Sequence, residues 1–114
     1  MTTREIFNKV KTALLKQNVQ CKDVNGNCVH INKNGLRCAI GHIIPNEIFD
    51  RKFNHSTLHE LLIYPQFQVI LPTDIDSDSG FYFLRDLQTI HDGYQPNDWA
   101  QELNNFCIKW HLDS

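Results

Sequence analysis

Two Asn-Gly dipeptides constrain the fold of this chain more than any other feature. They are Asn25-Gly26 and Asn34-Gly35, and both lie in one turn-rich segment. Asn and Gly tolerate the positive φ angles of a type I′ turn, so each dipeptide is a strong signal for a two-residue hairpin loop. The spacing predicts three short antiparallel strands at 20–24, 28–31 and 36–39.

The two predicted loops also fix a register. A loop at 25–26 sets Asp23 opposite Cys28 and Cys21 opposite His30, and directly opposed residues share a face of the sheet. A loop at 34–35 sets Ile31 opposite Cys38. One predicted face therefore consists of Cys21, Asp23, Cys28 and His30. The other face is apolar and is expected to be buried; it carries Val24, Val29, Ile31, Leu36 and Cys38.

Amphipathic helices are predicted on both sides of the hairpins. Thr2 and Glu5 have capping-box spacing, and apolar residues then recur at helical intervals: Ile6, Val10, Ala13 and Leu14. A short helix follows Ser56-Thr57, a longer one is capped by Asp78 or Ser79, and the last begins near Pro96–Asp98. The run at 39–44 is consistent with either a strand extension or a helical turn. Prolines bracket an apolar patch in 64–78, which predicts an irregular connection.

The predicted fold class is α+β and mainly helical, with four to five helices packed against a small antiparallel hairpin or meander. A length of 114 residues suits one compact domain, 1–114. No apolar run approaches the roughly 20 residues of a membrane helix, and charges interrupt the first 17 residues. We therefore expect a protein of the cytoplasm whose four cysteines are free thiols.

The charge balance excludes two simple functions. With a formal net charge of -2, the chain lacks the excess of positive charge that nucleic-acid binding through phosphate neutralisation requires. This net charge is also not negative enough for the protein surface to imitate a DNA backbone. Direct nucleic-acid binding is therefore not expected.

A zinc site at the predicted hairpin is one alternative. Structural zinc uses four Cys or His ligands, usually in close pairs. Cys21, Cys28 and His30 share the predicted face, but a fourth ligand would have to come from elsewhere, such as His42 or His55. Because unpaired cysteines often behave as small hydrophobic residues, no metal is predicted. Nor is any cofactor, since the nucleotide-binding, zinc-protease and calcium-loop motifs are missing from the sequence.

A thiol enzyme is a second alternative. Cys38 is predicted at a junction between strand and helix, where a helix N-terminus can lower the pKa of a thiol. His91 and Asp92 could supply the base and the orienting carboxylate of a Cys-His-Asp triad. The opposing interpretation places Cys38 on the buried face and His91 on the apolar stripe of its helix.

The segment at 64–82 is the strongest candidate for a binding surface. The segment contains several aromatic residues, and aromatic residues with few charges around them are typical of interface anchors. The predicted binding residues are Tyr64, Phe67, Asp74, Asp76, Asp78, Phe81 and Tyr82.

The sequence resembles a group of small phage and prophage accessory proteins. The residues that carry the resemblance lie in "GLRCAIGHIIPNEIFD" and "LRDLQTIHD": Gly35, Cys38, Ala39, Gly41, Ile44, Pro45, Glu47, Leu87, Gln88, His91 and Asp92. Where the pattern usually has an aromatic residue such as tyrosine after the acidic residue, this chain has Phe49, a mild departure. The resemblance implies a phage setting, in which binding and inhibition of a host protein, often one of a defence system, is a frequent role.

These observations favour a non-enzymatic protein that binds and inhibits a host protein. One alternative is sequestration of a nucleotide-like small molecule in a pocket near Cys38, His42 and His91. The other is hydrolysis that depends on Cys38, His91 and Asp92.

Overall fold

The computed structural model describes residues 1–112 and contains helices but no β-strand within that range. The Asn-Gly segment forms two isolated antiparallel bridges, Lys22 with Cys28 and Ile31 with Arg37. The predicted α+β fold with a hairpin or meander is therefore wrong, and the described chain is helical.

The reason lies in the type of turn. Gly26 and Gly35 both have φ +84°, but neither Asn25 nor Asn34 has a positive φ, as a type I′ turn would require. In the first turn the Gly26 N–H donates to the Asp23 carbonyl at 3.1 Å, and the Asp23 N–H donates to the Asn27 carbonyl at 2.8 Å. This is a three-residue loop that ends in a left-handed glycine.

The second turn repeats the pattern of the first. The Gly35 N–H donates to the Asn32 carbonyl at 3.0 Å, and the Asn32 N–H donates to the Leu36 carbonyl at 3.0 Å. In both turns a side-chain oxygen accepts two backbone N–H groups. Asp23 Oδ1 accepts from Asn25 and Asn27, and Asn32 Oδ1 accepts from Asn34 and Leu36. These Asx contacts favour the longer loop.

The additional loop residue shifts each predicted register by one position. Cys28 lies opposite Lys22 instead of Asp23, and Ile31 lies opposite Arg37 instead of Cys38. A slip of one residue exchanges the two faces of a strand, so the predicted faces do not exist. The ladder also ends early, because Asn54 Oδ1 accepts the N–H groups of His30 and Ile31 at 3.2 and 3.0 Å.

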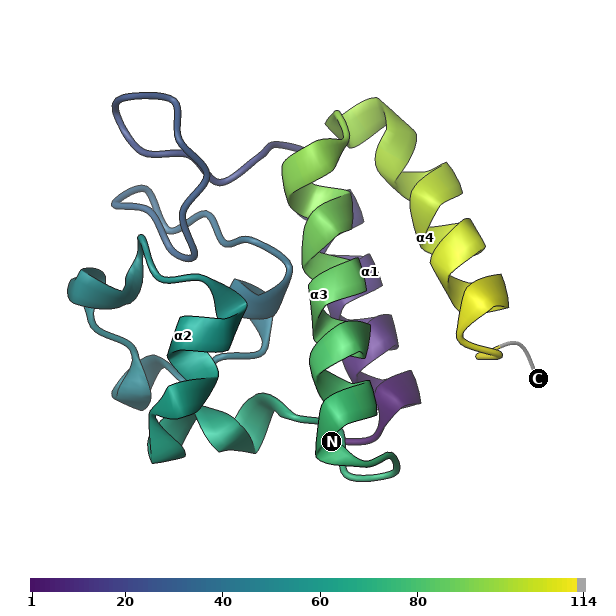
Figure 1. Ribbon diagram of the computed structural model, residues 1–114. Coiled ribbons are helices and arrows are strands. Elements are labelled where there is room, and N and C mark those ends of the chain that lie inside the picture. Colours follow the sequence, from purple (N-terminus) through teal and green to yellow (C-terminus); the bar gives the residue numbers. More distant parts are fainter. Residues whose placement is uncertain (113–114) are drawn as a thin grey trace.

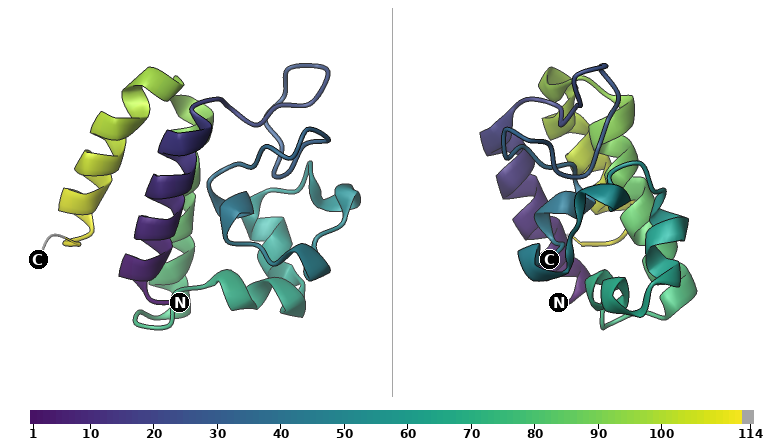
Figure 2. Two further views of the ribbon diagram at one scale, coloured as in Figure 1. Left: turned by 180° about the vertical axis from the view of Figure 1, so that it is seen from behind. Right: turned by 90° about the vertical axis from the view of Figure 1, so that its left-hand side faces the viewer.

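Three longer helices form one half of the molecule. They are α1 (Thr3–Gln17), α3 (Ser77–Gly93) and α4 (Trp99–Lys109), and both α1 and α3 pack against α4 (Figures 1 and 2). The predicted capping box of Thr2 and Glu5 is confirmed. Asp76 caps α3, slightly earlier than the predicted Asp78 or Ser79.

The other half consists of short helical segments and the two turns (Figure 1). The short helix predicted after Ser56-Thr57 is α2 (Leu58–Ile63), and Thr57 and Glu60 form its capping box. The remaining segments of this half are 3₁₀ helices: η1 (Ile40–His42), η2 (Asn46–Ile48), η3 (Arg51–Phe53) and η4 (Pro65–Ile70). A fifth 3₁₀ helix, η5 (Pro96–Asp98), leads from α3 into α4 in the half of the longer helices. The run at 39–44 is therefore a helical turn, and η4 occupies part of the predicted irregular connection.

Aromatic contacts join the elements in the core. The Phe106 ring of α4 lies 5.5 Å from that of Phe7 in α1 and 5.0 Å from that of Phe83 in α3. In the other half the rings of Phe53 and Phe67 are 4.8 Å apart. Among residues 1–112, no helix combines the length and the apolar character needed to cross a bilayer.

Candidate functional site

The histidine and aspartate of the predicted triad lie side by side at the end of α3. His91 is fully buried, and its Nε2 accepts a hydrogen bond from the backbone N–H of Cys21 at 2.8 Å. The proton of the neutral ring is therefore on Nδ1, which donates to Asp92 Oδ1 at 2.6 Å. Nε2 thus holds the segment before the first turn against α3, while Nδ1 is engaged with Asp92 of the same helix.

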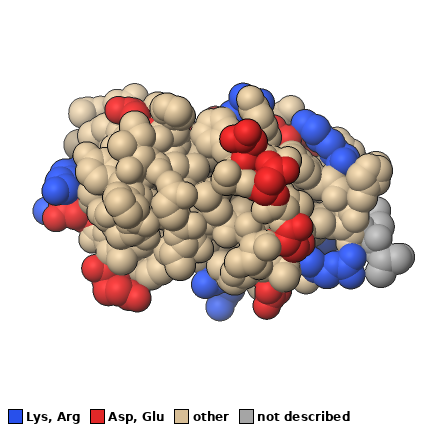
Figure 3. All heavy atoms as spheres, turned by 60° about the horizontal axis from the view of Figure 1, so that its bottom comes forward, with Lys and Arg blue, Asp and Glu red and all other residues tan. Residues whose placement is uncertain are grey.

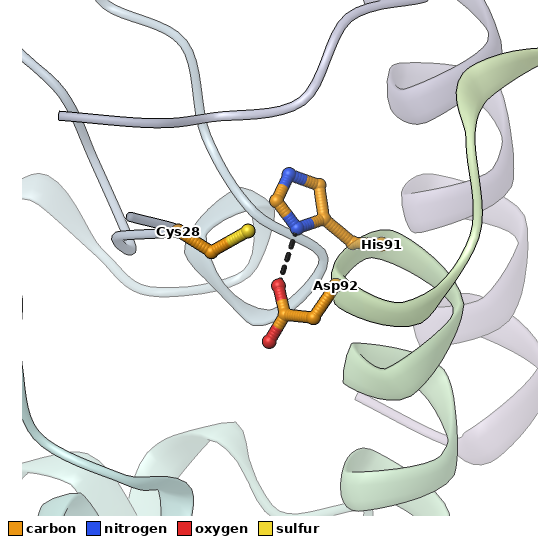
Figure 4. A group of neighbouring side chains, drawn as sticks. All are labelled: Cys28, His91 and Asp92. Carbon is orange, nitrogen blue, oxygen red and sulfur yellow. Dashed lines mark hydrogen bonds and ion pairs between the residues drawn. The ribbon is translucent and has the colours of Figure 1, made fainter. Parts of the chain in front are cut away.

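The carboxylate of Asp92 accepts several hydrogen bonds. Its carboxylate also accepts from Gln88 Nε2, at 3.0 and 3.1 Å. Burial alone would raise the pKa of Asp92, but hydrogen bonds from His91, Gln88 and Cys28 outweigh it and lower the pKa. Asp92 therefore carries a negative charge beside the neutral ring of His91. Figure 4 shows this pair with the Cys28 side chain next to it.

Cys28, His91 and Asp92 are the one group of potential metal ligands among the described residues, with ligand atoms within 4.8 Å of one another. A metal on His91 Nδ1 would displace the proton that this nitrogen carries. The other nitrogen would then have to donate, as metal-bound histidines normally do, yet it accepts from Cys21. The arrangement therefore does not fit a metal ion.

The three residues considered as candidate zinc ligands, Cys21, Cys28 and His30, are not brought together. Cys21 is buried and its thiol donates to the Leu36 carbonyl at 3.0 Å. Burial raises the pKa of Cys21 to about 11. His30 faces a different cysteine, and of the three only Cys28 belongs to the group at Asp92.

Cys38 is paired with His30, a partner that sequence reasoning missed. His30 Nε2 donates to the Ser56 carbonyl at 2.7 Å, so Nδ1 is the nitrogen that accepts the thiol proton of Cys38, at 3.2 Å. The sulfur also accepts the Gly41 N–H at 3.3 Å. The corrected register explains the pairing, because the Cys38 N–H donates to the His30 carbonyl at 2.9 Å.

The environment of Cys38 does not favour a nucleophile. The residue is fully buried, and this burial raises the pKa of its thiol far above the ordinary value. Burial likewise lowers the pKa of His30, so both groups remain neutral. The contacts of the alternative triad are not formed, since Cys38 pairs with His30 and His91 accepts from Cys21.

The predicted binding residues at 64–82 divide into three groups. Phe67 is fully buried and belongs to the core, so its prediction as a contact residue is wrong. Asp74 and Asp76 have structural tasks: Asp74 accepts from the N–H and the hydroxyl of Thr3 at 2.8 Å each, and Asp76 caps α3. Exposed or partly exposed are Tyr64, Asp78, Phe81 and Tyr82.

A groove lies beside these exposed residues. It has a volume of about 520 Å³ and runs between α2, η4 and the start of α3. Its apolar lining comes from Leu62, Leu71, Phe81 and Tyr82, and His59 and Asp78 supply polar groups. The aromatic residues contact one another, with the Phe81 and Tyr82 rings 5.4 Å apart. Arg85 lies over the Tyr82 ring at 4.7 Å and so helps to hold its orientation.

Comparison with known proteins adds no family to this description. No family model matches the chain, and neither the curated proteins nor the solved structures contain a match to it.

Proposed function

We propose that this chain is a non-enzymatic phage accessory protein that binds and inhibits a bacterial host protein in the host cytoplasm. The contact surface in this proposal is formed by α2, η4 and the start of α3. A role against host defence follows from the resemblance to small phage and prophage proteins, and the surface itself is argued from the structure.

The observation that carries the proposal is the exposure of large hydrophobic side chains around the groove. Ile63 is 68% exposed and Val69 is 60% exposed, and Tyr64 and Tyr82 follow at 44% and 49%. Burying such side chains is favourable, and an exposed apolar area beside a groove is typical of an interaction surface. Tyrosine is also among the residues that contribute most to binding energy at interfaces.

The charges around this surface indicate what a partner would offer. Figure 3 shows a broad uncharged area on the face that carries η4, with acidic groups gathered beside it. Asp78 lines the groove and is exposed. A partner that places an apolar ridge in the groove and a lysine or arginine next to Asp78 would match it in shape and charge.

The structure gives less support to the thiol-hydrolase alternative. Cys38 is buried and neutral, and the groups that could activate it are engaged in backbone contacts. A nucleophile needs an accessible thiolate. Binding therefore remains the function that the geometry supports best.

A site-specific cross-linking experiment tests the proposal. A photoreactive phenylalanine analogue at position 69 is expected to give a covalent adduct with one host protein when the chain is expressed in bacteria. Tyr82→Glu should abolish that adduct, because it places a charge at the centre of an apolar contact. The captured protein should lose activity when the purified wild-type chain is added.

The matched control uses Ile108, which is 57% exposed on α4. The same photoreactive residue at position 108 should not give the adduct, and Ile108→Glu should leave the adduct formed at position 69 intact. Identical adducts from positions 69 and 108, or no adduct from position 69, would count against this surface.

A further inference from the structure

A second cleft lies between the two Asn-Gly turns and the segment around η3. Its volume is about 770 Å³, and small-molecule sites commonly measure roughly 300–1,000 Å³. It shares no lining residue with the groove at α2, η4 and α3. The proposed protein-binding surface therefore does not account for it.

Part of the lining is apolar. Val29 is buried, and Ile31 and Phe49 are partly buried beside it. The Phe49 ring is supported by Phe53, with 6.5 Å between the ring centroids. Aromatic side chains of this kind provide a face on which a planar ring can stack.

The rim of the cleft is positively charged. Lys22, Lys33 and Arg51 line it against a single carboxylate, that of Asp23. Two backbone N–H groups already donate to Asp23 Oδ1. None of the three cations forms an ion pair with any residue in 1–112. In a chain with a net charge of -2, this concentration of unpaired positive charge favours an anion.

The walls of the cleft are held in place before any ligand arrives. Asp23 and Asn32 fix the two turns through their Asx contacts. Asn54, which also lines the cleft, accepts the His30 and Ile31 N–H groups and donates to the Ile31 carbonyl at 2.9 Å. A rigid site loses little conformational entropy on binding.

We propose that this cleft binds a nucleoside phosphate. The planar base stacks on Phe49 over the apolar lining, and the phosphate groups lie among Lys22, Lys33 and Arg51. This site differs from the pocket near Cys38, His42 and His91 that the sequence suggested for a nucleotide-like ligand, because Cys38 and His91 are fully buried. The proposal is independent of the protein-binding function.

Calorimetric titration of the full chain at about 0.15 M salt, where the Debye length is about 8 Å, tests the proposal. The probes are ADP, GDP, CDP and UDP, together with adenosine and pyrophosphate. At least one nucleoside diphosphate should bind with a Kd below about 1 mM. Arg51→Glu and Lys33→Glu should each weaken that binding about tenfold or more, since charge-assisted hydrogen bonds are among the strongest contacts available.

Lys9→Glu is the matched control, because it changes the net charge equally at an exposed position of α1. It should alter the Kd by less than about twofold, since Lys9 does not line the cleft and salt at this concentration largely screens exposed charges that are not in direct contact. Failure of all four nucleoside diphosphates to bind would overturn the proposal. So would a Kd for pyrophosphate or adenosine equal to that of the best nucleoside diphosphate, or equal weakening by Arg51→Glu and Lys9→Glu.

Discussion

At the scale of single residues, buried histidines join distant parts of this chain. His91 receives the N–H of Cys21 and donates to Asp92, so one imidazole connects the segment before the first turn to the end of α3. His30 does the same between Cys38 and the carbonyl of Ser56. In both cases every ring nitrogen has a partner, which is the usual condition for a histidine in a core.

Replacing His91 should therefore reduce stability. We expect His91→Ala to lower the free energy of unfolding by about 3 kcal/mol, because it creates a cavity and leaves the Cys21 N–H without an acceptor. His91→Gln should cost less, since its amide oxygen can replace Nε2. Urea denaturation at pH 7 measures both.

His59→Ala is the control for this prediction. His59 is exposed on α2, and its replacement should change the free energy of unfolding by no more than about 0.5 kcal/mol. If His91→Ala were as mild as His59→Ala, the connecting role of His91 would be refuted.

At the scale of elements, side chains that accept backbone N–H groups decide the shape of the turn-rich segment. Asp23 and Asn32 each stand two residues before the asparagine of an Asn-Gly pair, and each closes a three-residue loop. That repeated pattern of Asp or Asn, any residue, Asn and Gly is visible in the sequence, and it would have given the correct register. Asn54 then takes hydrogen bonds that another strand would have made.

Gly41 of η1 approaches the backbone of this segment closely. A Cβ there would overlap the carbonyl oxygen of His30, which accepts the Cys38 N–H. We expect Gly41→Ala to lower the free energy of unfolding by about 2 kcal/mol or more, because backbone cannot move aside as a side chain can. Thermal or urea denaturation gives the value.

Gly93→Ala offers the comparison within the same chain. A Cβ at Gly93 would lie 3.7 Å from Thr89 Cγ2, an ordinary contact, so stability should be unchanged or slightly raised. Equal losses at Gly41 and Gly93 would show that the close approach at His30 is not the cause.

At the scale of the whole molecule, the fold protects some thiols and leaves others accessible. The molecule is flat, with extents of 39 × 34 × 19 Å, so its thickness is about two helix diameters of roughly 10 Å. Cys21 and Cys38 are nevertheless fully buried where the turns, η1 and α3 meet, whereas Cys28 is only partly buried.

Alkylation should follow this difference in burial. With N-ethylmaleimide at pH 8, we expect Cys28 to react at least about tenfold faster than Cys21 or Cys38, because reactivity requires an accessible thiolate. Burial raises the pKa of the Cys28 thiol as well. Cys28 nevertheless remains more accessible to the reagent than the buried Cys21 and Cys38. Peptide mass spectrometry at timed intervals gives the rates.

Unfolding in urea is the control, since it should make the three thiols react at similar rates. Native Cys38 reacting as fast as Cys28 would mean that the core opens readily, and it would return the thiol-enzyme alternative to consideration.

The sequence alone determined the local helical features of this protein. The helix caps at Thr2 and Thr57 depend on hydrogen bonds with the residue three positions along the chain, so they follow from the local sequence. The spacing of apolar residues likewise defined the buried faces of α1, α3 and α4. Only the tertiary structure decided the rest. Three contacts join residues 8 or more positions apart: the pairing of Cys38 with His30, the packing of Phe67 against Phe53, and the hydrogen bond from the Ile31 N–H to Asn54. Such contacts depend on how the elements pack, and a one-residue change of register is enough to redirect them.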